Sequence, residues 1–327
     1  MQLAALLLLL CLAPALGRHV HQHNNTRSKR SAMNPIMYPN SVWDKREPIF
    51  YSFFGFGFQE IQAIKAAIKI YEENTCLKFR EGERDDDAYL LFQRSSSQLG
   101  KSDMGKSSES GPQNVVLAQN PFIPTIRHVA HEIGHSLGLY HTHQRSDRDN
   151  HVVYHESAIS PRFSNEKHNY DKNERGADEN YGVEYDFGSM MHYSAVMFST
   201  GGKKVLTSID PLYQESIGMN NYGPAQSDFM ILNHHYKCFD NCAGQQTPCL
   251  HGGFANPNNC DVCVCPRGFT GDYCSERPIG NVPGACGETI EISGDDWTNV
   301  KKTVGTNDWS DTHPLMECYF HLKVRFR

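Results

Sequence analysis

Three histidines and one glutamate within a single short run could together bind a metal ion and move a proton. The run HEIGHSLGLYH occupies residues 131–141. On a helix, His131 and His135 would lie one turn apart on the same face, with Glu132 beside them. Gly138 can end that helix and turn the chain back, so that His141 reaches the same ion. Three neutral histidines and one open position are typical of a catalytic zinc site.

The run fits the zinc-peptidase pattern H-E-x-x-H-x-x-G-x-x-H at every fixed position. The alternative is a chance match on an ordinary amphipathic helix, which at this composition occurs roughly 0.0002 times per chain. We therefore predict one zinc ion, held by His131, His135 and His141. Glu132 is not a ligand in this pattern, and we predict that it acts as the general base and acid.

A second motif lies downstream, where residues 189–193 read SMMHY. With the histidine run, it makes roughly residues 40–238 resemble the astacin family of metzincin peptidases. The resemblance implies an α+β catalytic domain of two lobes with the zinc cleft between them. It also implies that Met191 forms a turn beneath the metal and that Tyr193 is a further ligand able to swing away. The chain departs from the family at Thr142, where astacins have a glutamate that receives the mature amino terminus.

The N-terminal residues are typical of a secretory precursor. Residues 1–17 have a leucine-rich core that is too short to span a bilayer and is followed by small residues, which favours a signal peptide over a buried helix. Residues 18–30 are predicted to be a short propeptide with a glycosylation sequon at Asn24. It ends at Arg27-Ser28-Lys29-Arg30, which indicates a dibasic processing site or, alternatively, a solvated charge run. We therefore expect a secreted, extracellular zymogen without a membrane span.

The net charge and the number of cysteines indicate which partners and which covalent links to expect. The formal net charge of −6 gives no reason to expect nucleic acid or anionic lipid as a partner. Of the 11 cysteines, Cys11 would leave with the signal peptide, and the remaining even number favours disulfides in a secreted chain.

The last cysteines predict two small modules after the peptidase domain at residues 31–238. The spacing C-x6-C-x10-C-x2-C-x-C-x8-C resembles an EGF-like module at residues 239–275, although the C-x2-C spacing also suits zinc. Residues 276–327 resemble the opening of a CUB domain, a β-sandwich cut short. The resemblances imply the pairs Cys76–Cys238, Cys242–Cys260, Cys249–Cys263 and Cys265–Cys274, and leave Cys286 and Cys318 for the last module.

Hydrophobic periodicity predicts the elements around the zinc site. We expect strands at residues 49–54, 89–92 and 115–118, a helix at 59–74 and the zinc helix from about Thr125. Residues 142–180 are mostly polar, which predicts irregular structure. Within them, Asp147 and Asp149 are predicted to cap loops. The other histidines near the site, His128, His143 and His192, are predicted to be packing or surface residues.

The combined prediction is a secreted zinc metalloendopeptidase acting on protein or peptide substrates, such as extracellular matrix or other secreted proteins. Tyr193 would donate a hydrogen bond to the developing oxyanion. The competing hypothesis is a catalytically degenerate binding or adhesion protein that works through its EGF-like module. Glu132 counts against it, because a degenerate copy has no reason to keep a base that is not a ligand.

Overall fold

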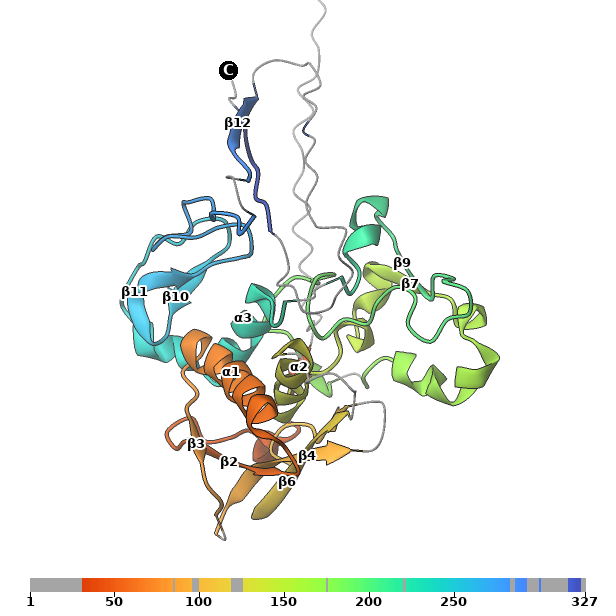
Figure 1. The fold of residues 1–327 in the computed structure, drawn as a ribbon, viewed down its shortest axis with the longest axis vertical. Coiled ribbons are helices and arrows are strands. Elements are labelled where there is room, and N and C mark those ends of the chain that lie inside the picture. The colour runs from red at the N-terminus through yellow and green to blue at the C-terminus, as the bar shows by residue number, and fades with distance from the viewer. Residues whose placement is uncertain are drawn as a thin grey trace, which may run out of the picture.

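A twisted five-stranded sheet underlies the zinc-binding run, in the strand order β3-β2-β4-β6-β5. Its strands are β2 (Ile49–Phe54), β3 (Phe79–Glu81), β4 (Ala88–Ser95), β5 (Lys101–Ser102) and β6 (Gly111–Ala118). The strands β3, β2, β4 and β6 run parallel, and β5 pairs antiparallel with β6 at one edge. Figure 1 shows this sheet beneath two long helices. The structure is a computed structural model.

Two helices cover one face of the sheet, α1 (Phe58–Asn74) and α2 (Ile126–Ser136). In α1 the side chains of Ile64, Ile68 and Tyr71 recur at helical spacing and are buried. The Tyr71 hydroxyl donates to the Ala130 carbonyl of α2 over 2.6 Å. Because the two helices share this core, α2 is held rigidly above the sheet. The predicted strands, helix and α+β class are confirmed.

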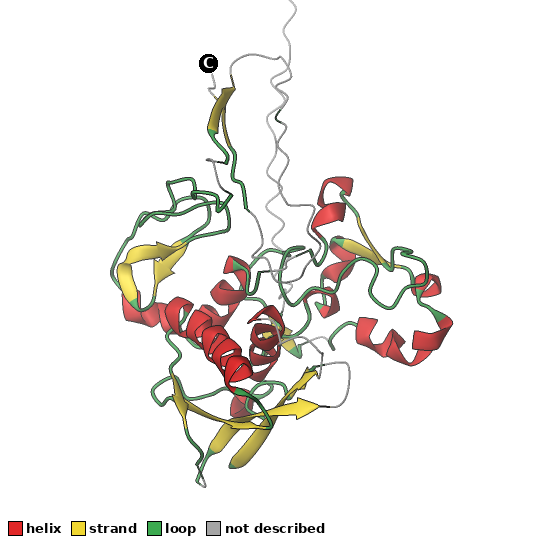
Figure 2. Cartoon of the chain, in the orientation of Figure 1, coloured by secondary structure: helices red, strands yellow, loops and turns green. Residues whose placement is uncertain are grey.

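The chain after α2 forms a region of short elements joined by loops, which we call the loop region (residues 142–219) (Figure 2). It contains short 3-10 helices and three short strands, η2 (Thr142–Gln144), η3 (Arg148–Asn150), β7 (Val152–Tyr154), η4 (Glu156–Ala158), η5 (Pro161–Tyr170), β8 (Asp178–Glu179), β9 (Leu206–Ser208) and η6 (Pro211–Ser216). A separate apolar cluster, which includes Val152, Tyr170 and Leu206, supports it.

Charged side chains are buried in the loop region. The Arg145 guanidinium donates to both carboxylate oxygens of Asp147 over 2.8 and 2.9 Å, and to the carbonyls of Val183 and Glu184. The prediction that Asp147 caps a loop is therefore wrong: its side chain makes no cap hydrogen bond before η3 and neutralises a buried arginine instead. Asp149 likewise forms ion pairs, with Arg148 and Lys172.

The helix α3 (Gln226–His235) packs beside the site, and the disulfide Cys76–Cys238 ties the chain after it to the end of α1. The remaining short elements are β1 (Ala32–Met33), η1 (Pro39–Ser41), η7 (Cys238–Cys242), β10 (Phe254–Asn256), β11 (Asn259–Val264), β12 (Thr289–Ile292) and β13 (His321–Val324). The other disulfides are Cys242–Cys260, Cys249–Cys263, Cys265–Cys274 and Cys286–Cys318.

The small disulfide-linked segment with β10 and β11 contacts the catalytic part of the chain directly. The Asn258 amide donates to the carbonyls of Glu72 and Thr75 at the end of α1. Phe254 packs edge to face against Phe239. These bonds satisfy carbonyls at a helix end that has no further helical partners.

The structure describes residues 31–84, 86–95, 100–118, 126–174, 176–219, 222–282, 286–292, 300 and 317–324. The predicted signal peptide, propeptide and sequon at Asn24 lie outside these residues, as does much of the segment 276–327. Among the described residues, no helix has both the length and the hydrophobicity needed to cross a bilayer.

Candidate metal centre

The helix α2 presents two of the predicted ligands side by side. The ring centroids of His131 and His135 are 4.7 Å apart, as expected for residues one helical turn apart. Gly134 between them lies against Tyr71 and against the sulfur-containing ends of Met190 and Met191, so that an added Cβ would meet these atoms at 3.1 to 3.2 Å. We call the turn at residues 189–191 the methionine turn. Its close approach to α2 therefore depends on a glycine at position 134.

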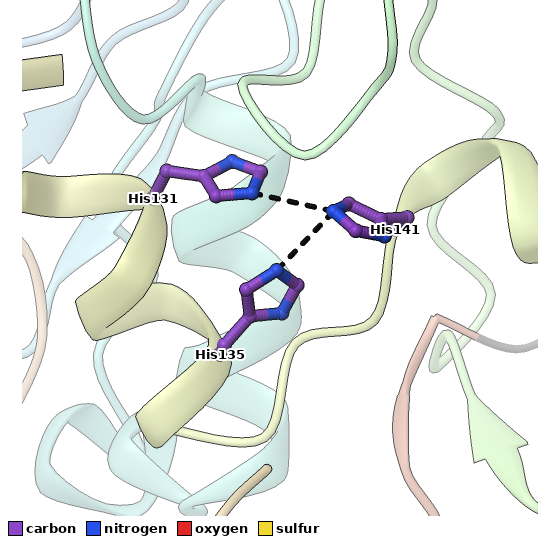
Figure 3. Close-up of side chains that lie close together, drawn as sticks. All are labelled: His131, His135 and His141. Atoms are coloured by element: carbon purple, nitrogen blue, oxygen red, sulfur yellow. Dashed lines mark hydrogen bonds between the residues drawn. The ribbon is translucent and has the colours of Figure 1, made fainter. Parts of the chain in front are cut away.

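A turn at Gly138 brings the chain back toward α2, so that the third predicted ligand, His141, lies near the other two. This residue has φ of +95°, a left-handed conformation that ends α2, and its amide donates to the His135 carbonyl. The chain then places His141 opposite the helix (Figure 3). The Nε2 atom of His141 lies 3.3 Å from Nε2 of His135 and 3.3 Å from Nε2 of His131.

The hydrogen bonds on the far side of each ring decide what these nitrogens can do. The Nδ1 atoms of His131 and His135 contact the carbonyls of Met190 and Leu139 over 3.0 and 2.7 Å. The Nδ1 of His141 lies 3.2 Å from the Gln144 side-chain oxygen. Because each of these partners is an acceptor, each Nδ1 carries the proton and each Nε2 presents a lone pair.

The lone pairs of the three Nε2 atoms therefore point toward one another with no proton between them. Burial lowers the pKa of all three imidazoles, that of His135 to about 4, so they are neutral and cannot repel a cation by charge. All three nitrogens lie within 4.8 Å of one another. A tetrahedral zinc ion with Zn–N bonds of about 2.05 Å would hold its ligand nitrogens about 3.3 Å apart. The donor set therefore fits one zinc ion.

Glu132 lies beside the ligands and is almost fully buried, with 8% of its surface exposed. Burial raises the pKa of its carboxyl group to about 8, although a bound divalent cation would favour the ionised form. Gly100, directly before the edge strand β5, lies so close that any Cβ there would collide with the Glu132 carboxylate. The carboxylate thus has room only because residue 100 has no side chain.

Tyr193 and Met191, the other predicted site residues, come from the loop region. The Tyr193 ring centroid is 4.6 Å from that of His141, and burial raises the pKa of its hydroxyl to about 12, so the hydroxyl remains a hydrogen-bond donor. Met191 packs beneath α2. His143 stacks on Tyr193, and His192 bonds to the Tyr185 hydroxyl over 2.7 Å, so neither joins the three ligands. His128 is exposed on α2.

Sequence reasoning missed three residues around the centre. These are Gly100 against Glu132, Gln144 behind His141, and Asp228, which bonds to the methionine turn. Gln144 lies three residues after His141 and could have been found from that spacing. Asp228 is 38 residues away from Met190, and no local pattern indicates the contact.

The chain matches the Astacin peptidase family over residues 35–237. It is 30% identical over 284 residues to the zinc metalloproteinase nas-31 of Caenorhabditis elegans, covering 86% of this chain and 43% of the relative. It is 32% identical over 284 residues to the zinc metalloproteinase dpy-31 of Brugia malayi, covering 84% and 44% respectively. The chain thus spans about half the length of the curated relatives it matches.

Among solved structures, the fold is similar to high choriolytic enzyme 1, a hatching-enzyme zinc protease of the medaka Oryzias latipes. The TM-score is 0.51 at 25% sequence identity, and the match covers 61% of this chain and 91% of the other. Together with the three converging nitrogens, these similarities confirm the prediction of one zinc ion as cofactor.

Proposed function

This chain belongs to the astacin family of zinc metallopeptidases, and we propose that it is a secreted endopeptidase that hydrolyses peptide bonds in extracellular proteins. Matrix and other secreted proteins are the proposed substrates. The observation that carries the proposal is the convergence of three histidine lone pairs next to a buried carboxyl group that is not itself a ligand. That arrangement provides a metal and a separate base, which hydrolysis requires.

Zinc bound by His131, His135 and His141 would lower the pKa of a water molecule and polarise the scissile carbonyl. Glu132 would then take the proton from the attacking water and deliver it to the leaving amine. Its burial supports this role, because a carboxylate shielded from solvent holds the transferred proton close to the reacting atoms. Gly100 would leave the space in which this carboxylate works.

Tyr193 would donate its hydroxyl hydrogen to the oxyanion that develops on the substrate carbonyl. Its ring packs against both His141 and His143, with centroid distances of 4.6 and 4.2 Å. This packing supports the role, because a donor that is fixed before the reaction needs little reorganisation.

We propose a two-lobed peptidase domain at residues 31–238, with the cleft between the sheet and the loop region. An EGF-like module at 239–275 and a CUB-like segment at 276–327 would follow. Three disulfides between residues 242 and 274 support the EGF-like assignment, and the Cys286–Cys318 disulfide supports a separate CUB-like segment.

The proposal includes removal of a signal peptide at 1–17 and cleavage after Arg30 to activate a zymogen. Ser31 would then carry the new amino group, and it is buried with 4% of its surface exposed. Its carbonyl accepts a hydrogen bond from the Tyr140 amide, next to His141. The Thr142 hydroxyl donates to Ser189 over 2.9 Å, so this position forms a neutral hydrogen bond where the family has a glutamate.

The variant Glu132→Gln tests the function. It should retain zinc, because all three ligands remain, and lose nearly all hydrolysis of casein or a peptide library, because no base remains. Hydrolysis at the wild-type rate would contradict the mechanism. A zinc-loaded wild-type protein without any hydrolysis would favour the binding or adhesion protein instead.

A further inference from the structure

A buried carboxylate lies behind the zinc site and takes no part in the proposed chemistry. Asp228, in the first turn of α3, has only 2% of its surface exposed. Its Oδ1 accepts from the Ser189 hydroxyl over 2.6 Å. Its Oδ2 accepts from the backbone amides of Met190 and Ala225 over 3.2 and 2.8 Å. The carboxylate therefore joins the start of α3 to the methionine turn.

The Ser189 hydroxyl extends this connection within the turn. It accepts from the Met191 amide over 3.0 Å and from the Thr142 hydroxyl over 2.9 Å. The backbone of all three turn residues, 189–191, is thereby fixed directly or indirectly by one side chain of α3. Hydrogen bonds to a carboxylate are among the stronger ones in proteins, so this anchor is stiff.

The backbone carbonyls of the same turn contact the metal-binding elements. The Met190 carbonyl accepts from Nδ1 of His131 over 3.0 Å. The Met191 carbonyl accepts from the amide of Thr142, the residue after His141, over 2.9 Å. The methionine turn thus orients His131 on α2, and it also holds the backbone next to His141, which follows α2 in the sequence. His135 is outside this connection, because its Nδ1 contacts Leu139.

We propose that Asp228 is a positioning residue of the zinc site, which holds the turn at 189–191 so that its carbonyls set the orientation of His131 and the placement of His141. Residues that orient a metal ligand through its second ring nitrogen typically affect metal affinity about 10–100-fold. The inference rests on the zinc site alone, so it can fail or hold independently of the peptidase activity.

The test measures the zinc dissociation constant by competition with a chelator, without any substrate. Asp228→Ala should weaken zinc binding about 10–100-fold. The matched control is Asn233→Ala on the same helix. Asn233 is also fully buried, but its side-chain amide donates to the Asn74 carbonyl and does not bond to the turn. This control should bind zinc with about wild-type affinity.

A spectrum of the cobalt-substituted protein gives a second readout, because its visible bands respond to ligand geometry. We expect altered bands in Asp228→Ala and wild-type bands in Asn233→Ala. Unchanged affinity and bands in folded Asp228→Ala would overturn the proposal, as would an equal loss in both variants, which would indicate a merely structural role. Should Asp228→Ala not fold, Ser189→Ala decides: weaker zinc binding supports the proposal, and unchanged binding overturns it.

Discussion

The sheet region (residues 49–139) and the loop region build one site by different means. Buried residues of the sheet region are mostly apolar, and hydrogen-bonded strands and helices satisfy its backbone. The loop region instead buries Arg145, Arg148, His143 and Asp178, and uses side chains to satisfy backbone carbonyls. The first region supplies His131, His135 and Glu132 on one helix. The second supplies Tyr193 and the methionine turn.

The sheet region and the loop region should therefore be disrupted by different kinds of change. A helix packed on a sheet holds its side chains by shape, so steric changes should disturb it. A loop that is held by buried ion pairs should instead be sensitive to charge and to pH, because an unpaired buried charge is costly.

The largest effect is expected from breaking the Arg145–Asp147 pair. Asp147→Asn should lower the free energy of unfolding by about 3 kcal/mol at neutral pH, because the Arg145 side chain is only 1% exposed and loses its counterion. Burial alone would raise the pKa of Asp147, but hydrogen bonds from His151 and Arg145 outweigh it and hold that pKa well below its ordinary value of 3.8.

The sign of the pH effect follows from this depressed pKa. The stabilisation by Asp147 is fully present above pH 3.8 and is lost as the pH falls towards the folded-state pKa. Urea unfolding of the wild type and of Asp147→Asn at several pH values should therefore show that the difference between their free energies of unfolding shrinks in acid. Asp44→Asn, at the exposed pair with Arg46, is the control and should change stability far less. A pH-independent difference for Asp147 would contradict the charge-based explanation of the loop region.

Tyr193→Phe tests the contribution of the loop region to the chemistry. Removing the hydroxyl should lower kcat roughly 10²- to 10³-fold, with KM nearly unchanged, if it stabilises the oxyanion. Steady-state kinetics should show no such loss for Tyr213→Phe, whose ring stacks on Phe187 in the same region. An unchanged kcat with weaker zinc retention would instead make Tyr193 chiefly a resting ligand.

Gly100→Ala tests the sheet region by shape alone. The added methyl group would collide with the Glu132 carboxylate and displace it, which should lower kcat about 10-fold while zinc content stays the same. The neighbouring Lys101→Ala removes an exposed side chain and should behave as wild type. Combining Gly100→Ala with Glu132→Asp should show a smaller loss than the product of the two single effects, because the shorter carboxylate relieves the collision. Strictly multiplicative effects would argue against the contact.

The sequence predicts the sheet region better than the loop region, for a physical reason. The apolar run at residues 49–54 and the helical spacing through Ile64, Ile68 and Tyr71 are local signals, and both predicted elements are present. The histidine spacing is also local, so a single zinc site could be predicted from the amino-acid order alone. Where the local pattern of apolar residues determines an element, a short stretch of sequence is enough to predict that element.

The loop region and the outer layer of the site depend on contacts between distant residues. Asp147 could be read as a loop cap, because nothing in the sequence says that Arg145 would be buried beside it. Asp228 and Gly100 lie far along the chain from the atoms that they touch. No short motif reports such contacts, and only the tertiary fold brings them together.

Zinc binding by three histidines, from α2 and the chain after it, is the claim on which the proposed chemistry depends. Metal analysis of purified wild type, His141→Ala and His128→Ala tests it most directly, since the exposed His128 lies on α2 but outside the three ligands. We expect about one zinc per chain in wild type and His128→Ala, and little zinc with no hydrolysis in His141→Ala. Full zinc content and activity in His141→Ala would contradict the claim.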